Sequence, residues 1–154
     1  MEKISISADG FKEGGTIPDE FTCKGKDISP SLYWEGIPAG AKSISLIMDD
    51  PDAWGGAFVH WVLYNIPGQT LILPKGIPHN QTLADGSMQG MTDFGRAGYG
   101  GPCPPPGKPH RYYFKVYALD IKLELPPGVS KTQFENAMKG HILASGELMG
   151  KYQR

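Results

Sequence analysis

The chain has 154 residues, with 15 lysines and arginines against 16 aspartates and glutamates, and a formal net charge of -1. This length predicts a single domain, residues 1–154, that buries enough surface to fold without cross-links. The balanced charge argues against broad electrostatic binding to nucleic acid or to an anionic membrane, so any anion must be recognised locally.

No part of the sequence approaches the ~20 consecutive apolar residues of a membrane-spanning helix. The first residues also lack the basic and apolar regions of a signal peptide. We therefore expect a cytoplasmic protein with no membrane span. Cys23 and Cys103 show no metal-ligand spacing. In a reducing cytosol we expect both to be free thiols, with the disulfide-rich proteins of thermophiles as the exception.

The first half of the chain predicts short β-strands. Residues 3–11 alternate polar and apolar side chains and are expected to start a sheet. Residues 43–48, "SISLIM", predict a strand with one better-buried face. Residues 59–66, "VHWVLYNI", are β-branched and aromatic and end at a Pro-Gly turn signal. We expect the last two segments to pair in antiparallel fashion, joined by the acidic loop "DDPDAW".

The second half predicts two more strands and one helix. Residues 110–119 alternate, so that His110, Tyr112 and the even-numbered residues after them share one face. Residues 130–140 carry a Ser-x-x-Gln capping box and a closing glycine, which indicate a short helix. Residues 143–152 predict a last strand. The 21 glycines and 14 prolines spread along the chain favour many turns. We therefore predict a mainly β fold of two packed antiparallel sheets with a short helix near the C-terminus.

Three groups of residues near predicted loops could carry chemistry. The first is the acidic cluster of Asp49, Asp50 and Asp52, whose alternative interpretation is a set of solvated turn carboxylates. The second is His60, on the predicted strand face of Val62, whose alternative is a core histidine bonded to a backbone carbonyl. Neither pattern is specific by itself.

The third group is the glycine- and proline-rich segment 98–112, "GYGGPCPPPGKPHRY". Its glycines allow backbone N–H groups to approach a ligand and its prolines stiffen the rest, so the loop could form an anion-binding nest. The alternative is a rigid connector between sheets. His110 and Tyr112 follow on one strand face, where an imidazole and a phenol could point into the same pocket.

Five segments together carry a family resemblance: "SPSLYW", "SISLIMDDPDAW", "FVHWVLYNIP", "GYGGPCPPPGKPHRYYFKVYALD" and "GHILASGELMGKYQR". They resemble, in order, the signatures of the phosphatidylethanolamine-binding protein family, in its bacterial and archaeal Raf kinase inhibitor-like branch. The resemblance covers about residues 21–154. It implies a two-sheet antiparallel β fold with a small preformed pocket for phosphate-like anions.

The resemblance also implies the residues of that pocket. The ligand-binding positions are Asp50, His60, Gly101, Pro102, His110 and Tyr112, and the rim positions are Asp52, Trp54 and Trp61. Trp54 departs from the family, in which proline is common at this position, so φ is no longer fixed and a large aromatic is added. We expect ligand selectivity or partner contact to depend on this residue.

The predicted site is an acid-assisted anion site. A carboxylate and a phosphate ~4 Å apart repel by about 4 kcal/mol at an effective dielectric constant of 20. We therefore expect Asp50 either to accept a hydrogen bond from a protonated ligand oxygen or to orient a histidine. Protonated His60 and His110 would offset the remaining charge, while loop N–H groups and Tyr112 would donate to the anion.

The resulting prediction is a non-catalytic, kinase-inhibitor-like binding protein for a phosphate-like anion or phosphorylated headgroup, without metal or cofactor and acting through a protein partner. One alternative is a serine protease inhibitor, with Trp54 or the segment "GIPHNQTL" entering a protease cleft. The other is a hydrolase that uses a metal ion or Cys103 in the same pocket. The resemblance also suggests a homodimer.

Overall fold

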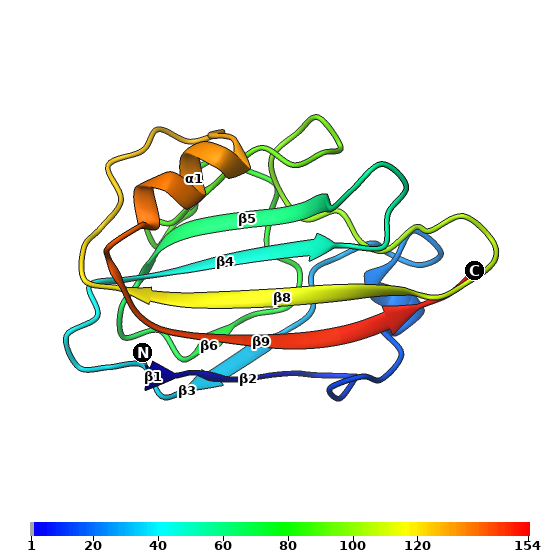
Figure 1. Cartoon of the computed structure of the whole chain (residues 1–154), viewed down its shortest axis with the longest axis horizontal. Coiled ribbons are helices and arrows are strands. Elements are labelled where there is room, and N and C mark those ends of the chain that lie inside the picture. The colour runs from blue at the N-terminus through cyan, green and yellow to red at the C-terminus, as the bar shows by residue number, and fades with distance from the viewer. Residues whose placement is uncertain (1) are drawn as a thin grey trace.

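Two β-sheets, one short α-helix and one 3-10 helix make up the structure, a computed structural model that describes residues 2–154 (Figure 1). The strands are β1 (Glu2–Lys3), β2 (Ser5–Ala8), β3 (Leu32–Glu35), β4 (Ser43–Asp50), β5 (Phe58–Pro67), β6 (Ile72–Leu73), β7 (Met88–Gln89), β8 (His110–Leu119) and β9 (Ile142–Tyr152). The 3-10 helix η1 spans Asp19–Phe21 and the α-helix α1 spans Lys131–Met138. The predicted mainly β fold with a late helix is confirmed.

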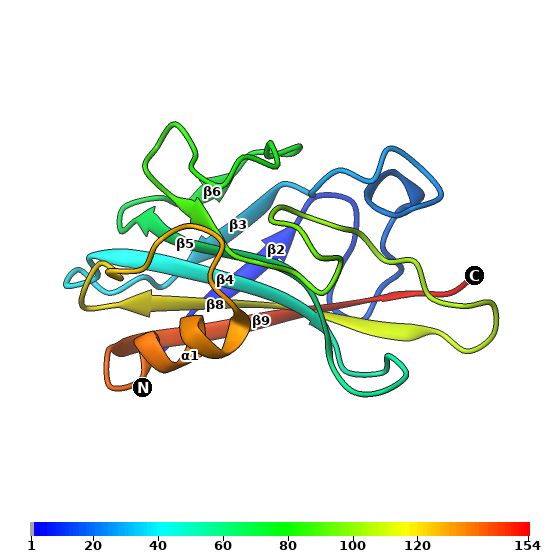
Figure 2. The same ribbon diagram turned by 90° about the horizontal axis from the view of Figure 1, so that it is seen from above.

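The larger sheet has the strand order β1-β9-β8-β4-β5-β7, and the smaller has the order β2-β3-β6. All pairs are antiparallel except β1 with β9. The N-terminal segment therefore contributes a strand to each sheet, β1 to the larger and β2 to the smaller. In Figure 2 the smaller sheet and α1 lie on opposite sides of the larger sheet.

Both faces of the larger sheet are covered. One hydrophobic cluster lies between the sheets and includes Trp34, Met48 and Phe114. A second cluster lies under α1 and includes Ile47 and Phe134. All eight residues of β4 are therefore buried, whereas the sequence pattern predicted one better-buried face. The pattern could not show that α1 packs on the second face.

The helix begins and ends as its sequence predicts. The Ser130 hydroxyl accepts a hydrogen bond from the backbone N–H of Gln133 at 3.2 Å, and the side-chain oxygen Oε1 of Gln133 accepts one from the backbone N–H of Ser130 at 3.1 Å. Gly140, two residues after the helix, has a φ of 81°, which glycine adopts at little cost. Within residues 2–154, no helix combines the length and the apolar character needed to cross a membrane.

Strand β4 runs two residues further than predicted, so Asp49 and Asp50 belong to the strand and not to the loop. Their backbones pair with Val59 and Phe58 of β5. Because successive strand residues point to opposite faces, Asp49 lies on the side of α1, where Lys115 is 3.3 Å away, and Asp50 lies on the opposite side.

A β-bulge at His60 changes which residues of β5 share a face. Met48 pairs with Trp61 and the next residue, Asp49, pairs with Val59, so His60 is an extra residue on this strand. Val62 packs under α1, whereas His60 contacts the rings of the pocket described below. The prediction that His60 and Val62 share a face is therefore wrong, since a bulge breaks the two-residue period.

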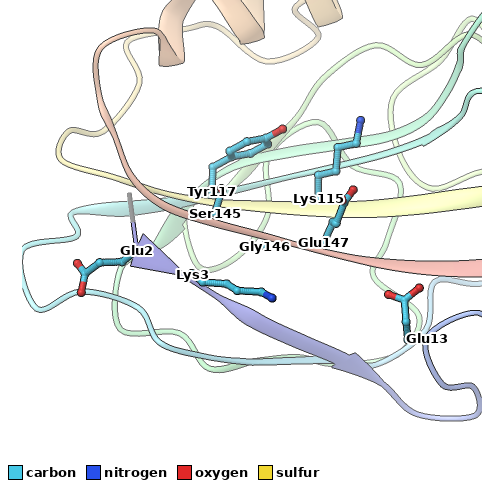
Figure 3. Close-up of a pocket in the computed structure, with 8 residues that line it drawn as sticks. All are labelled: Glu2, Lys3, Glu13, Lys115, Tyr117, Ser145, Gly146 and Glu147. Atoms are coloured by element: carbon cyan, nitrogen blue, oxygen red, sulfur yellow. The ribbon is translucent and has the colours of Figure 1, made fainter.

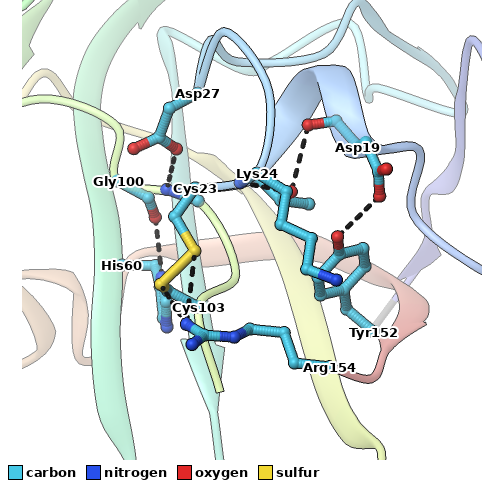
Figure 4. Close-up of a disulfide and its surroundings, with 11 residues drawn as sticks. Asp19, Cys23, Lys24, Asp27, His60, Gly100, Cys103, Tyr152 and Arg154 are labelled. Atoms are coloured by element: carbon cyan, nitrogen blue, oxygen red, sulfur yellow. Dashed lines mark hydrogen bonds between the residues drawn. A yellow bond between two sulfur atoms is a disulfide. The ribbon is translucent and has the colours of Figure 1, made fainter. Parts of the chain in front are cut away.

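Cys23 and Cys103 form a disulfide, with a Cα–Cα distance of 5.4 Å across 80 residues of sequence (Figure 4). The prediction of two free thiols is therefore wrong. The fold brings the segment after η1 beside the proline-rich loop, where the Cys23 N–H donates to the carbonyl oxygen of Pro102 at 3.1 Å. Sequence spacing carries no information on this proximity.

Candidate functional site

A pocket of about 220 Å³ lies at the end of the larger sheet where β5 and β8 begin. The β4–β5 loop and the proline-rich loop complete its wall. Its lining residues are Asp50, Ala53, Trp54, Phe58, His60, Phe94, Cys103, Pro104, Pro105, His110 and Tyr112. Four predicted ligand-binding residues, Asp50, His60, His110 and Tyr112, are therefore together around one space.

Asp50 is buried and both of its carboxylate oxygens have partners. Oδ2 lies 2.6 Å from Nδ1 of His110, and Oδ1 accepts the backbone N–H of Asp52 at 2.8 Å. A carboxylate at this distance favours the imidazole form that carries a proton on Nδ1. The other ring nitrogen of His110, Nε2, is not bonded to Asp50. Of the two roles predicted for Asp50, this geometry favours the orientation of a histidine.

His60 is held in a similar way by the loop. Its Nδ1 lies 2.6 Å from the carbonyl oxygen of Gly100, and because a carbonyl only accepts, Nδ1 carries the hydrogen (Figure 4). Burial lowers the pKa of His60, against the opposing effects of this hydrogen bond and of nearby carboxylates. His60 is therefore mainly neutral near pH 7, with Nε2 as an acceptor.

Aromatic rings surround the His60 imidazole. The rings of Phe58, Phe94 and Tyr112 lie 5.1, 5.1 and 5.2 Å from it between centroids, all edge to face. Tyr112 is buried, and its burial and then the charge of Asp50 raise the pKa of its phenol. Tyr112 therefore stays protonated and can donate a hydrogen bond.

Gly101 and Pro102 lie behind the pocket wall and do not line it. The Gly101 N–H donates to Oδ1 of Asp27 at 2.8 Å, and the Pro102 carbonyl accepts from Cys23. The lining residues of the loop are Cys103 and the two prolines that follow, which have no N–H. The predicted donation from loop N–H groups to an anion therefore has no support at Gly101, because that N–H is already bonded.

The three predicted rim residues differ in their positions. Asp52 accepts two hydrogen bonds from the Arg111 guanidinium, at 2.8 and 2.9 Å, and these lower the pKa of Asp52 to about 2. Trp54 lines the pocket mouth and is 99% exposed. Trp61 is not at the rim, because the bulge turns it into the core, where its Nε1 donates to Gln89 at 2.7 Å.

The aromatic wall of the pocket was not predicted from the sequence. Phe58 lies two residues before His60, a spacing that could have indicated its position. Phe94 comes from a distant loop and packs against Phe58 with a centroid distance of 4.9 Å. No pattern in the sequence places Phe94 here, so this contact depends on the fold.

A second hollow, of about 670 Å³, lies over β1, β8 and β9 (Figure 3). Its lining includes Lys3, Glu13, Lys115 and Glu147, which carry charges of both signs. No residue predicted for the site lies there. The described part of the chain also holds no group of three or more histidine, cysteine or acidic side chains placed to bind a metal ion.

Comparisons with known proteins agree with the fold and the sequence pattern. The family model "Phosphatidylethanolamine-binding protein" matches residues 7–153. The chain is 53% identical to a UPF0098 protein of Aquifex aeolicus, over all of this chain and 89% of the relative. It is 47% identical to one of Methanothermobacter thermautotrophicus, over 98% and 99% of the two chains.

Two solved structures have the same fold. A phosphatidylethanolamine-binding protein homolog from Chlamydia trachomatis superposes with a TM-score of 0.90 at 38% identity, over 100% of this chain and 99% of the other. Escherichia coli YbcL, described as a member of the mammalian PEBP family, superposes with a TM-score of 0.91 at 34% identity, over 99% of both chains. The chain therefore belongs to the phosphatidylethanolamine-binding protein family.

Proposed function

We propose that this chain is a single-domain, non-catalytic binding protein whose pocket takes a small phosphate-like anion, free or as part of a headgroup. The observation that carries the proposal is that His60 and His110 line the same pocket. Each has Nδ1 engaged by a protein acceptor, so each can offer Nε2 to a ligand. Tyr112 adds a phenol donor beside them.

The charges of the site favour anion binding that is coupled to the uptake of protons. Asp50 is buried beside His110, so its carboxylate repels an anion unless a charged imidazole offsets it. Burial lowers the pKa of His60, so its imidazole is mainly neutral near pH 7 before an anion binds. A bound anion stabilises its charged form, so binding is expected to take up protons.

The remaining walls limit the size and chemistry of the ligand. A volume of about 220 Å³ is below the range of ~300–1,000 Å³ that is usual for drug-sized ligands. Phe58, Phe94 and Trp54 make one side apolar. The pocket therefore suits an oxyanion with a small apolar or aromatic substituent.

The experiment is calorimetric titration with sulfate, which does not titrate near neutral pH, at about pH 5.5 and about pH 7.5 in buffers of different ionisation enthalpy. We expect proton uptake and an affinity about tenfold higher at the lower pH, since at least one histidine must become charged. The His60→Gln and His110→Gln variants should each weaken binding and flatten its pH dependence.

His141→Gln is the matched control, because His141 pairs with Asp120 at 2.8 Å and does not line the pocket. It should bind sulfate as the unchanged protein does. Equal affinity in His110→Gln, or binding without proton uptake, would refute the proposed site.

We also propose that the protein acts on a protein partner through the β4–β5 loop, which projects from one end of the molecule (Figure 1). Trp54 in this loop is 99% exposed. A kinase is the first candidate partner. A serine protease is the second, since an exposed aromatic side chain on a projecting loop could enter a specificity pocket. Kinases and serine proteases are assayed for inhibition by the unchanged protein and by Trp54→Ala. Loss of inhibition in the variant supports a contact through this loop, and equal inhibition contradicts it.

A further inference from the structure

The disulfide is exposed to solvent and forms part of the pocket wall. Cys23 and Cys103 are both exposed, and Cys103 lines the pocket. Figure 4 shows the bond between the segment that follows η1 and the proline-rich loop. Exposed disulfides are the ones that thiols can reach and exchange, whereas buried structural ones resist reduction.

A cation lies beside one of the two sulfur atoms. Nη1 of Arg154 is 3.0 Å from Sγ of Cys103 and 3.8 Å from Sγ of Cys23 (Figure 4). A neighbouring guanidinium stabilises a thiolate, and a more stable thiolate leaves faster in exchange. The two distances therefore favour Cys103 as the leaving group and Cys23 as the sulfur that is attacked.

We propose that the Cys23–Cys103 disulfide is a thiol-exchange site that controls the anion pocket, and that its reaction partner is a low-molecular-weight thiol or a dithiol reductase. The attacking thiolate forms a bond to Sγ of Cys23. The disulfide breaks, and its electron pair leaves on Sγ of Cys103, beside Arg154. A second thiolate then attacks the reagent's sulfur in the mixed disulfide and releases Cys23. Two reagent thiols are oxidised to their disulfide, and the protein disulfide is reduced.

The exchange would alter the wall through the short segment 103–106. Three of its residues are prolines and have no N–H. In the described chain, the hydrogen bonds that fix the loop are made by its flanks, at Gly101, Pro102 and Gly107, while the disulfide and Arg154 hold Cys103. Reduction would free this segment and place a thiolate in the wall. Both changes weaken anion binding, a consequence that rests on the proposed function.

The chemistry is tested on the full chain with reduced glutathione, followed by alkylation of free thiols and peptide mass spectrometry. We expect glutathione on Cys23 and the alkyl group on Cys103. Arg154→Gln should slow reduction about threefold, the change expected when the pKa of the leaving thiol rises by ~1 unit. Lys151→Gln, which removes an exposed cation of β9, is the control and should react at the unchanged rate. Glutathione mainly on Cys103, or an unchanged rate in Arg154→Gln, would overturn the assigned chemistry.

The effect of reduction on anion binding is tested by sulfate titration of the oxidised and the reduced protein. We expect the dissociation constant for sulfate to rise about tenfold on reduction. This is the change expected if the reduced protein has the binding-competent conformation of the wall about one-tenth of the time. The Cys23→Ser, Cys103→Ser double variant should bind weakly with and without reductant. The reduced protein has the unchanged sequence, so this comparison does not depend on the folding of the double variant.

The two experiments separate the two proposals. If the oxidised and reduced forms bind sulfate equally well, control of the pocket is refuted. If neither form binds sulfate, the proposed function and the control that rests on it both fail, while the glutathione experiment still decides whether the disulfide exchanges as assigned.

Discussion

Replacing Gly101 with alanine tests whether packing behind the wall fixes the pocket. A Cβ at Gly101 would lie 2.1 Å from the carbonyl oxygen of Phe21 and 2.5 Å from Oδ1 of Asp27. The first of these atoms is backbone and cannot rotate away. The φ of Gly101 is outside the left-handed region, so the penalty is steric. The loop must therefore move away from η1, and the hydrogen bond from Gly101 to Asp27 is lost.

The expected cost follows from these two effects. A hydrogen bond to a charged group contributes about 1.5 to 3 kcal/mol, and a forced shift in a packed region costs about 1 to 3 kcal/mol. The sum, about 2.5 to 6 kcal/mol, should lower the midpoint of thermal unfolding by about 5 to 24 °C, at ~2–4 °C per kcal/mol for a chain of this length. Circular dichroism measures the midpoint, and sulfate titration at a temperature where the variant is folded measures the pocket.

The matched control is Gly40→Ala. No heavy atom lies within 4 Å of a Cβ built at Gly40, and its φ is not left-handed. This variant should unfold within about 2 °C of the unchanged protein and bind sulfate equally well, since surface changes of this kind stay within ~0.5 kcal/mol. If Gly101→Ala behaves as Gly40→Ala does in both assays, the loop does not position the pocket as described.

Two further substitutions test the rim. Asp52→Asn should lower stability at neutral pH by less than ~1 kcal/mol, because the pair with Arg111 is partly exposed. The pKa of Asp52 falls from 3.8 to about 2 on folding, so its contribution is present above about pH 4 and lost as the pH falls through about 2. Urea unfolding across this range checks the prediction, and a difference that does not change with pH contradicts it. Trp54→Ala should change stability by less than ~0.5 kcal/mol, since the side chain is 99% exposed. By calorimetry it should weaken binding of phenyl phosphate about fivefold and leave inorganic phosphate unchanged; an equal loss for both ligands would show that Trp54 does not contact the substituent.

The pattern of hydrophobic residues was reliable where each face of a strand has one environment. In β8 the even-numbered residues from Tyr112 to Ala118 share one face, as predicted, and are buried between the sheets, whereas Arg111, Tyr113, Lys115 and Tyr117 of the other face are exposed or half-buried. The same logic failed in β4, because α1 arrives from a distant part of the chain and buries Ile47 on the other face. A local pattern can describe a strand but not the element that will cover it.

The candidate site shows the same division. Asp50, His60, His110 and Tyr112 were predicted together and line one pocket. Phe94 was missed, because it reaches the pocket from a loop with no recognisable pattern.

The sequence by itself determined the β-rich fold class, the capped helix, the family resemblance and the identity of the polar groups in the pocket. These depend on local propensity and on short motifs, which need no knowledge of distant contacts. Only the tertiary structure decided that a bulge at His60 breaks the alternation of β5 and that Trp61 lies in the core. It also decided that Cys23 and Cys103 are bonded and that Gly101 braces the wall from behind. Each of these features depends on register or on contacts across more than 70 residues, where sequence spacing carries no geometric information.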